Sequence, residues 1–451
     1  MHAPSGRWLI SCWRTESIMN EYQLIKDMKY EYNADIGLDY SSPCRGVWNI
    51  VHYGTLVPEG HQIYVCPTSC LRGVVLTTAE MGFDAMKKLS TIAVGEDNIL
   101  DGDMEEEVLH GTEKIIDALP QRPRMVMIFT SCIHHFMAVN YQRVYKILRR
   151  EYPDIDFIDC YMDPIMRRKK EPMPNLRKQI LRVLQPADHL PDHVSFVGNC
   201  FPMTKYCDLY QHLVRSGISI SDLTTMQNYD EFHEMEKSCI NFTFNRKAEL
   251  AGRDLKLRLG QKWMIMRSSF VYDEIDADMK AASEALGIAA PPQEETRALR
   301  AEAEEKAQAL RQKLNGTPLS IDYTAIEQPL GFAIYLLEHG FNVESVLIDV
   351  ITESEDVFRK LQAIRPDLKV YSSLGWNMRQ ADRHHDGKIV AVGQKSAYFN
   401  DTPYFVNLVE NAGMYGYRGL SHLLDLIAQA ADTPQDLPTL VQHKGWGCSC
   451  S

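Results

Sequence analysis

The chain has 451 residues, of which 45% are hydrophobic and 24% charged, and its formal net charge is −12. This length is too great for one hydrophobic core, so we expect two or three domains of an ordinary soluble globular protein. Acidic residues (60) outnumber basic ones (48), which argues against general nucleic-acid binding. No apolar run approaches the ~18 residues of a membrane span.

Cysteine usage points to a reducing compartment. The chain has 11 cysteines, an odd number, and its N-terminus lacks the apolar core of an export signal. We therefore expect no disulfide framework and a cytoplasmic protein. Met19 offers an alternative start, so residues 1–18 carry no structural prediction.

Up to residue 266, strand-like runs alternate with helical patterns, which predicts parallel α/β layers. The expected strands lie at 124–130, 156–160, 193–197, 241–244 and 263–266. The expected helices lie at 141–150, 206–216 and 246–259, and Gly260 is a suitable stop for the last of them.

Residues 293–315 have a different composition, rich in Glu, Ala, Arg and Gln. The spacing predicts one long amphipathic helix from Gln293 to Leu314, ended by Gly316 and Pro318. Its apolar stripe consists of Leu299, Ala303, Ala307, Leu310 and Leu314. We interpret it as a solvent-exposed packing helix at a domain junction, with no catalytic role.

The α/β alternation resumes after this helix. Helices are expected at 330–339, 355–364 and about 419–430, and strands at 343–348, 369–371 and 388–392. Neither a Gly-x-Gly-x-x-Gly fingerprint nor a Gly-x-x-x-x-Gly-Lys-Ser/Thr loop occurs, which argues against standard NAD or ATP binding. An electron or energy donor would then be a separate protein.

Three cysteines in the first third of the chain stand in separate turn-like or strand-end settings. Cys44 lies in Ser-Pro-Cys-Arg-Gly, Cys70 ends Cys66-Pro-Thr-Ser-Cys70, and Cys132 follows a buried run that ends at Thr130. None has the Cys-x-x-Cys spacing of a zinc knuckle. Thiolates from separate loops that converge on one face are what a large iron–sulfur cluster needs.

In these segments the chain resembles the nitrogenase component 1 superfamily. Cys44-Arg-Gly-Val, Cys66-Pro-Thr-Ser-Cys70-Leu-Arg-Gly and Thr130-Ser-Cys132 occupy the places of that family's three cluster cysteines. The resemblance runs from about residue 30 to about residue 430. It implies an α/β fold of three Rossmann-like modules with parallel sheets. The predicted parts are an extension at 1–30, modules at 31–190, 191–315 and 316–435, and a tail at 436–451.

The resemblance also implies cofactors and partners. Cys44, Cys70 and Cys132 would bind an interfacial cluster shared with a homologous second subunit, in a heterotetramer. The cluster would be an eight-iron P-cluster or a four-iron cluster. Cys66 is the alternative to Cys70, which we favour because it directly precedes the helix entrance Leu-Arg-Gly. Electrons would come from an ATP-dependent, nitrogenase-reductase-like iron protein.

Two further positions concern a large iron–sulfur cofactor. Cys239 resembles the cysteine by which the nitrogenase catalytic subunit holds one end of that cofactor, and this favours a catalytic-type subunit. Its plain alternative is a buried small residue at a strand start. The family's second ligand is a histidine, and Tyr415 stands at the matching position here. This departure puts dinitrogen reduction by the standard arrangement in doubt.

Three activities fit the resemblance, and no catalytic residue is assigned. The first, which we favour, is a methylthio-alkane reductase that cleaves C–S bonds of small thioethers. The second is a tetrapyrrole reductase of the protochlorophyllide or nickel-sirohydrochlorin type, and the third is a scaffold for nitrogenase cofactor assembly. A Rossmann-type binding protein with buried cysteines is the non-redox alternative.

Overall fold

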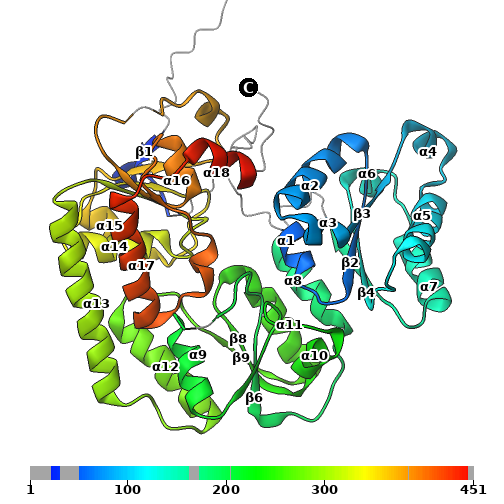
Figure 1. Cartoon of the computed structure of the whole chain (residues 1–451), viewed down its shortest axis with the longest axis horizontal. Coiled ribbons are helices and arrows are strands. Elements are labelled where there is room, and N and C mark those ends of the chain that lie inside the picture. Colours follow the sequence, from blue (N-terminus) through cyan, green and yellow to red (C-terminus); the bar gives the residue numbers. More distant parts are fainter. Residues whose placement is uncertain (1–21, 31–49, 162–171, 204, 384, 445–451) are drawn as a thin grey trace, which may run out of the picture.

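The computed structural model describes residues 22–30, 50–161, 172–203, 205–383 and 385–444. These residues form three α/β modules, each built on one largely parallel sheet (Figure 1). The predicted fold class is therefore confirmed. No helix in the described part of the chain is long and apolar enough to cross a membrane.

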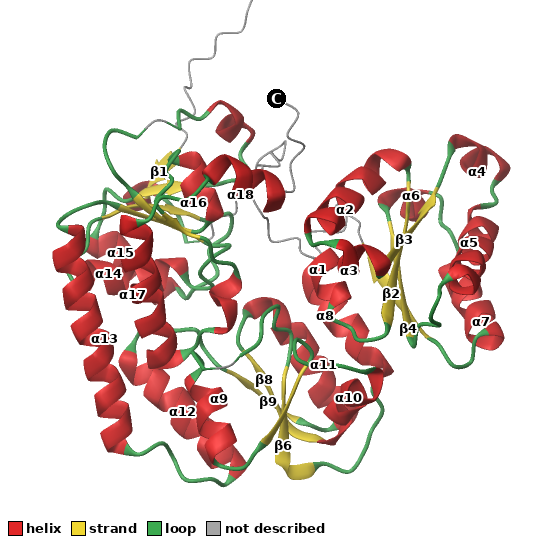
Figure 2. Ribbon diagram, in the orientation of Figure 1, coloured by secondary structure: helices red, strands yellow, loops and turns green. Residues whose placement is uncertain are grey.

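The first module contains a parallel sheet in the order β3-β2-β4-β5. Its strands are β2 (Gly60–Cys66), β3 (Leu89–Ala93), β4 (Met125–Thr130) and β5 (Asp156–Tyr161). Every residue of β2 and β4 is buried, as expected for parallel strands covered on both faces. Figure 2 shows helices on both sides of this sheet.

Side chains of β2 alternate between two cores. Ile63 and Val65 pack toward α5 (Met104–Ala118) and α7 (Tyr141–Glu151). Tyr64 and Cys66 belong to the core on the other face, which includes residues of α1 and α8. The other helices of this module are α1 (Ile50–Thr55), α2 (Thr68–Glu80), α3 (Phe83–Lys87), α4 (Glu96–Asp101), α6 (Cys132–Phe136) and α8 (Pro172–Ile180).

The second module has a parallel sheet in the order β7-β6-β8-β9. Its strands are β6 (Leu190–Phe196), β7 (Ser219–Asp222), β8 (Ser238–Thr243) and β9 (Lys262–Ile265). Its helices are α9 (Asp208–Arg215), α10 (Tyr229–His233), α11 (Glu249–Leu259) and α12 (Tyr272–Leu286). Gly260 ends α11 with φ 71°, as predicted, and α8 packs against α11 to join the first two modules.

The third module has a six-stranded sheet in the order β1-β12-β11-β10-β13-β14. Its strands are β1 (Tyr22–Leu24), β10 (Leu319–Asp322), β11 (Val343–Leu347), β12 (Lys369–Tyr371), β13 (Val390–Val392) and β14 (Phe405–Val406). Its helices are α14 (Pro329–Glu338), α15 (Glu355–Ile364), α16 (Gln394–Phe399), α17 (Gly416–Asp432) and α18 (Leu437–Lys444). The edge strand β1 pairs antiparallel with β12, a pairing that the sequence did not predict.

The long helix α13 (Gln293–Leu314) has the predicted bounds. It runs beside α17 (Figure 1), and the two helices are in extensive contact. Its buried stripe is Ala303, Ala307, Leu310 and Leu314, so small side chains allow the helices to approach closely. The polar face of α13 is exposed, in agreement with the predicted packing role.

His61 at the start of β2 provides a test of the first module at low pH. Its side chain is 4% exposed and its Nε2 lies 2.8 Å from Ser90 Oγ. Burial lowers the pKa of His61 from 6.5 to about 4. The unfolded chain therefore binds more protons between these values, and the stability present above pH 6.5 is lost as pH falls through 4.

When the pH falls from 6.5 to 4, the free energy of unfolding of the wild type should fall by about 3 kcal/mol because of His61. The His61→Gln variant should lack this decrease. Glutamine can still bond to Ser90 but does not titrate. Urea denaturation at both pH values measures the difference, with the exposed His110→Gln as control. An unchanged pH dependence in His61→Gln would contradict the assignment.

Candidate functional site: a cysteine edge and a module junction

Three cysteines lie at the carboxyl edge of the first-module sheet. Cys66 is the last residue of β2, Cys70 lies in the first turn of α2, and Cys132 is the first residue of α6 directly after β4. Strands β2 and β4 are neighbours, and Val65 pairs with Thr130. The parallel arrangement therefore brings the three thiols to one edge, where α/β folds place their ligands. We call this group the cysteine edge.

The three thiols differ in accessibility. Cys66 is buried, Cys132 is half-buried and Cys70 is exposed. Burial, with smaller contributions from the nearby Cys70 and Cys132, raises the pKa of Cys66 to about 12. Cys66 is therefore the least accessible of the three thiols to a cluster shared with a second subunit.

Cys44, the third predicted cluster ligand, lies outside the described residues. Within the described ranges, no three His, Cys, Asp or Glu side chains are arranged to hold a metal ion. The cysteine edge thus offers two accessible thiols, Cys70 and Cys132. It fits an iron–sulfur cluster if Cys44 and a partner supply the remaining thiolates.

The structure does not bring Cys239 and Tyr415 together. Cys239 is near the amino end of β8, where its thiol donates to Pro191 O at 3.5 Å. Tyr415 contacts Phe244, just beyond the carboxyl end of β8, with ring centroids 5.4 Å apart. At ~3.3 Å per residue the five steps from Cys239 to Phe244 span about 16 Å, so Cys239 and Tyr415 lie at opposite ends of β8. Their roles as ligands stay predictions.

Tyr415 itself is 3% exposed and precedes α17. Its backbone bridges to Cys207, and its N–H donates to Tyr206 O at 2.9 Å. Its hydroxyl has no hydrogen-bond partner among the residues that the structure describes. Burial raises its pKa well above 10.

A buried ion network occupies the place where the three modules meet. Arg177 of α8 is fully buried and pairs with Glu410 of the third module at 3.1 Å. Lys247 of the second module pairs with the same carboxylate at 2.9 Å. We call Arg177, Lys247 and Glu410 the junction network. The two cations lower the pKa of Glu410 far below its usual range, against the opposing effect of burial.

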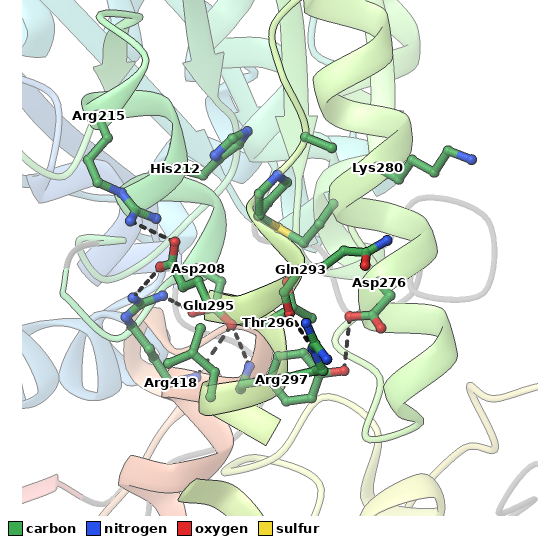
Figure 3. Close-up of a pocket in the computed structure, with 15 residues that line it drawn as sticks. Asp208, His212, Arg215, Asp276, Lys280, Gln293, Glu295, Thr296, Arg297 and Arg418 are labelled. Carbon is green, nitrogen blue, oxygen red and sulfur yellow. Dashed lines mark hydrogen bonds and ion pairs between the residues drawn. The ribbon is translucent and has the colours of Figure 1, made fainter. Parts of the chain in front are cut away.

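A separate cavity of about 450 Å³ lies between α9, α12 and the first turns of α13 and α17 (Figure 3). One wall is a chain of ion pairs, in which Arg215 and Arg418 each lie 2.8 Å from Glu295 and Arg418 lies 2.7 Å from Asp208. These pairs hold the pKa of Glu295 at about 2, chiefly through Arg215. The described residues that line this cavity include no thiol, so they offer no ligand for an iron–sulfur cluster.

Comparison with known proteins decides the family. A family profile described as nitrogenase component 1 type oxidoreductase matches residues 56–432. The chain belongs to this family. The structure of nitrogenase Cp1 at pH 6.5 matches with a TM-score of 0.63 and 13% identity over 90% of this chain and 95% of that one. The Cp1 structure at pH 5 gives a TM-score of 0.58 and 10% identity, over 90% and 91%.

At these identities the two nitrogenase Cp1 structures establish the fold alone. No curated protein sequence matches the chain. Membership of the component 1 family confirms the resemblance seen in the cysteine segments and makes the chain an oxidoreductase by family. The sequence predictions did not include Arg177, Lys247 or Glu410, because nothing local in the sequence distinguishes them from surface charges.

Proposed function

We propose that this chain is a subunit of a nitrogenase-like reductase complex. In this proposal an iron–sulfur cluster at Cys44, Cys70 and Cys132 receives electrons from an ATP-dependent iron protein and passes them toward the substrate. The cysteine edge carries the proposal, because thiols from β2–α2 and β4–α6 meet at one edge of the sheet. A cluster bound there would supply one-electron chemistry that the protein's own side chains lack.

The proposed ligand is Cys70 in preference to Cys66. An interfacial cluster needs thiolates that a second subunit can approach, and Cys70 is exposed whereas Cys66 is 0% exposed. Cys66 also contributes its backbone to the sheet, because Val94 N donates to Cys66 O at 3.2 Å. Cys66 therefore has a structural role in the strand that leads to the cysteine edge.

This preference gives a testable pair of variants. We expect Cys70→Ala to lose at least half of the cluster iron with little change in stability. Cys66→Ala should keep the iron but destabilise the first module by about 1–2 kcal/mol, since it leaves a small cavity. Iron analysis and urea denaturation of both variants measure the difference. The reverse pattern would make Cys66 the ligand.

The proposed partner is a homologous second subunit that completes the cluster, in a heterotetramer. Large apolar side chains are exposed beside the cysteine edge. Phe136 and Met137, shortly after Cys132, are 65% and 40% exposed, and Leu76 of α2 is 48% exposed. Exposed apolar side chains of this kind mark protein interaction surfaces. They support a subunit interface around Cys70 and Cys132.

The proposed reaction is reductive cleavage of a C–S bond in a small thioether such as a methylthio-alkane. Two electrons from the iron protein and two protons convert the thioether into methanethiol and a hydrocarbon. This substrate class rests on the sequence resemblance alone. The separation of Cys239 from Tyr415 favours a second candidate, a tetrapyrrole reductase, because that class needs only the interfacial cluster and a cleft for the tetrapyrrole.

Anaerobic purification of the chain with its partner tests the proposal. We expect a coloured complex with iron and acid-labile sulfide, which oxidises a reduced iron protein only when ATP is present. Methanethiol release from a methylthio-alkane would support the first reaction, and reduction of protochlorophyllide or a nickel tetrapyrrole the second. A colourless, iron-free complex would contradict the proposed function and leave a Rossmann-type binding protein.

A further inference from the structure

The junction of the three modules is the place where a ligand would be expected. Residues that follow β6 and β8 of the second module face residues that follow β10 and β14 of the third. Helix α8 closes the junction from the side of the first module through Arg177. Crevices at the carboxyl ends of parallel strands and between domains are the usual ligand sites of α/β proteins.

In this chain the junction is filled by its own charged side chains. Both oxygens of Glu410 are engaged, Oε2 by Arg177 and Oε1 by Lys247. Arg177 also donates to Asn245 Oδ1 and to Cys200 Sγ, each at 3.2 Å. The side chains of Arg177 and Glu410 are 0% and 7% exposed. Two cations and one carboxylate thus cross-link all three modules, with a further carboxylate, Glu327, close to Lys247.

The backbone conformation around Glu410 fixes the position of this carboxylate. Glu410, Asn411 and Ala412 have φ of 46°, 53° and 43°, and Gly413 follows with 77°. Left-handed conformations in non-glycine residues are costly and persist only where the surroundings enforce them. Here the N–H groups of Glu410 and Asn411 donate to Thr324 O and Ala325 O at 2.8 and 2.9 Å.

Little space remains beside the network. A cavity of about 20 Å³ is lined by Cys200, Phe244, Asn245 and Glu410, among others. One water needs about 10–15 Å³ by the same measure, so this space holds one water and not a cluster of several metal ions. Cys200 is buried, and its thiol accepts from Arg177. This hydrogen bond makes the Cys200 thiol part of the junction network.

We infer that this chain closes its three-module junction with the Arg177–Glu410–Lys247 network and holds no large metal–sulfur cofactor there, so that the substrate-reducing centre of the complex belongs to the homologous partner. The inference rests on the proposed function for the existence of that partner. It reverses the preference for a catalytic-type subunit that Cys239 suggested. This chain then contributes thiolates to the interfacial cluster, and the junction network holds its three modules in a fixed arrangement.

Iron anomalous diffraction from crystals of the anaerobic complex tests the inference directly. We expect iron peaks at the cysteine edge of this chain, none at its junction, and further iron within the partner. An iron peak between the second and third modules of this chain would overturn the inference. A complex without iron peaks would defeat the proposed function, and the density at Glu410 would still decide whether the junction is closed.

Variants provide a second measurement that does not depend on crystals. The double variant Lys247→Gln/Glu410→Gln removes a cation and the carboxylate together, which keeps the junction close to charge balance. We expect it and Cys239→Ala to keep the full iron content of the complex. Cys132→Ala should lose iron from the interfacial cluster and keep the iron of the partner. Loss of iron from either of the first two variants, when urea denaturation shows that the variant still folds, would place a cofactor in this chain.

Discussion

Replacing Cys132 by alanine is expected to remove most of the cluster iron while leaving the fold of the first module intact. Cys132 is half-buried and opens the short helix α6, so its side chain contributes little to the core. Its thiolate, in contrast, is one of the few ligands that this chain can offer at the cysteine edge. Loss of an outer partner of a metal ligand already costs about 10–100-fold in affinity or activity.

The measurement is iron and acid-labile sulfide per complex, with the visible absorbance of the anaerobic protein. We expect the iron of the interfacial cluster to fall by at least half and electron uptake from the iron protein to fall more than ~100-fold. Cys160→Ala is the matched control, because Cys160 is a fully buried cysteine on the neighbouring strand β5. It should keep its iron. Full iron in Cys132→Ala would contradict the cluster assignment.

The parts of the site that could be predicted from sequence are those with local signals. The buried run before Cys132 marks a strand end, and a parallel sheet places such ends at one edge. The bounds of α13 follow from a change in composition and from Gly316 and Pro318 beyond its end. In both cases the deciding residues lie within a few positions of one another.

The other features of the fold and of the site depend on contacts between segments that are far apart in the sequence. Arg177 and Glu410 are 233 positions apart. Nothing in the sequence around either residue distinguishes it from a charged residue on the surface. The pairing of Tyr22 with Tyr371 places an N-terminal strand in the last module, and an N-terminal segment carries no signal for such a pairing. The left-handed turn at Glu410 has no signature, because non-glycine residues rarely adopt it.

The same limitation applies to the relative placement of Cys239 and Tyr415. Their motifs suggest a shared cofactor, but only the strand geometry shows that the body of β8 separates them. A sequence alignment gives the element on which a residue lies and not the end of the sheet that it faces. One turn of chain after β8, at Asn245 and Lys247, the polar groups do face the junction.

The junction network predicts the largest effect on stability. Arg177→Met should destabilise the protein by about 3–5 kcal/mol, because breaking a buried pair leaves a carboxylate without its full compensation. Arg177 additionally stacks over Tyr53, with its guanidinium carbon 5.3 Å from the ring centroid, so its loss also removes contact with the first module. Urea denaturation of the full chain measures the change.

Two comparisons separate charge from packing in this result. Arg122→Met breaks a pair with Asp154 that has a similar distance, 2.7 Å, but side chains 49% and 58% exposed. It should cost less than about 1 kcal/mol. The double variant Arg177→Met/Glu410→Gln should recover part of the loss, because it removes the carboxylate that Lys247 alone would compensate and leaves Lys247 beside Glu327. If Arg177→Met costs no more than Arg122→Met, the network does not hold the modules together, and the junction is free to open around a cofactor.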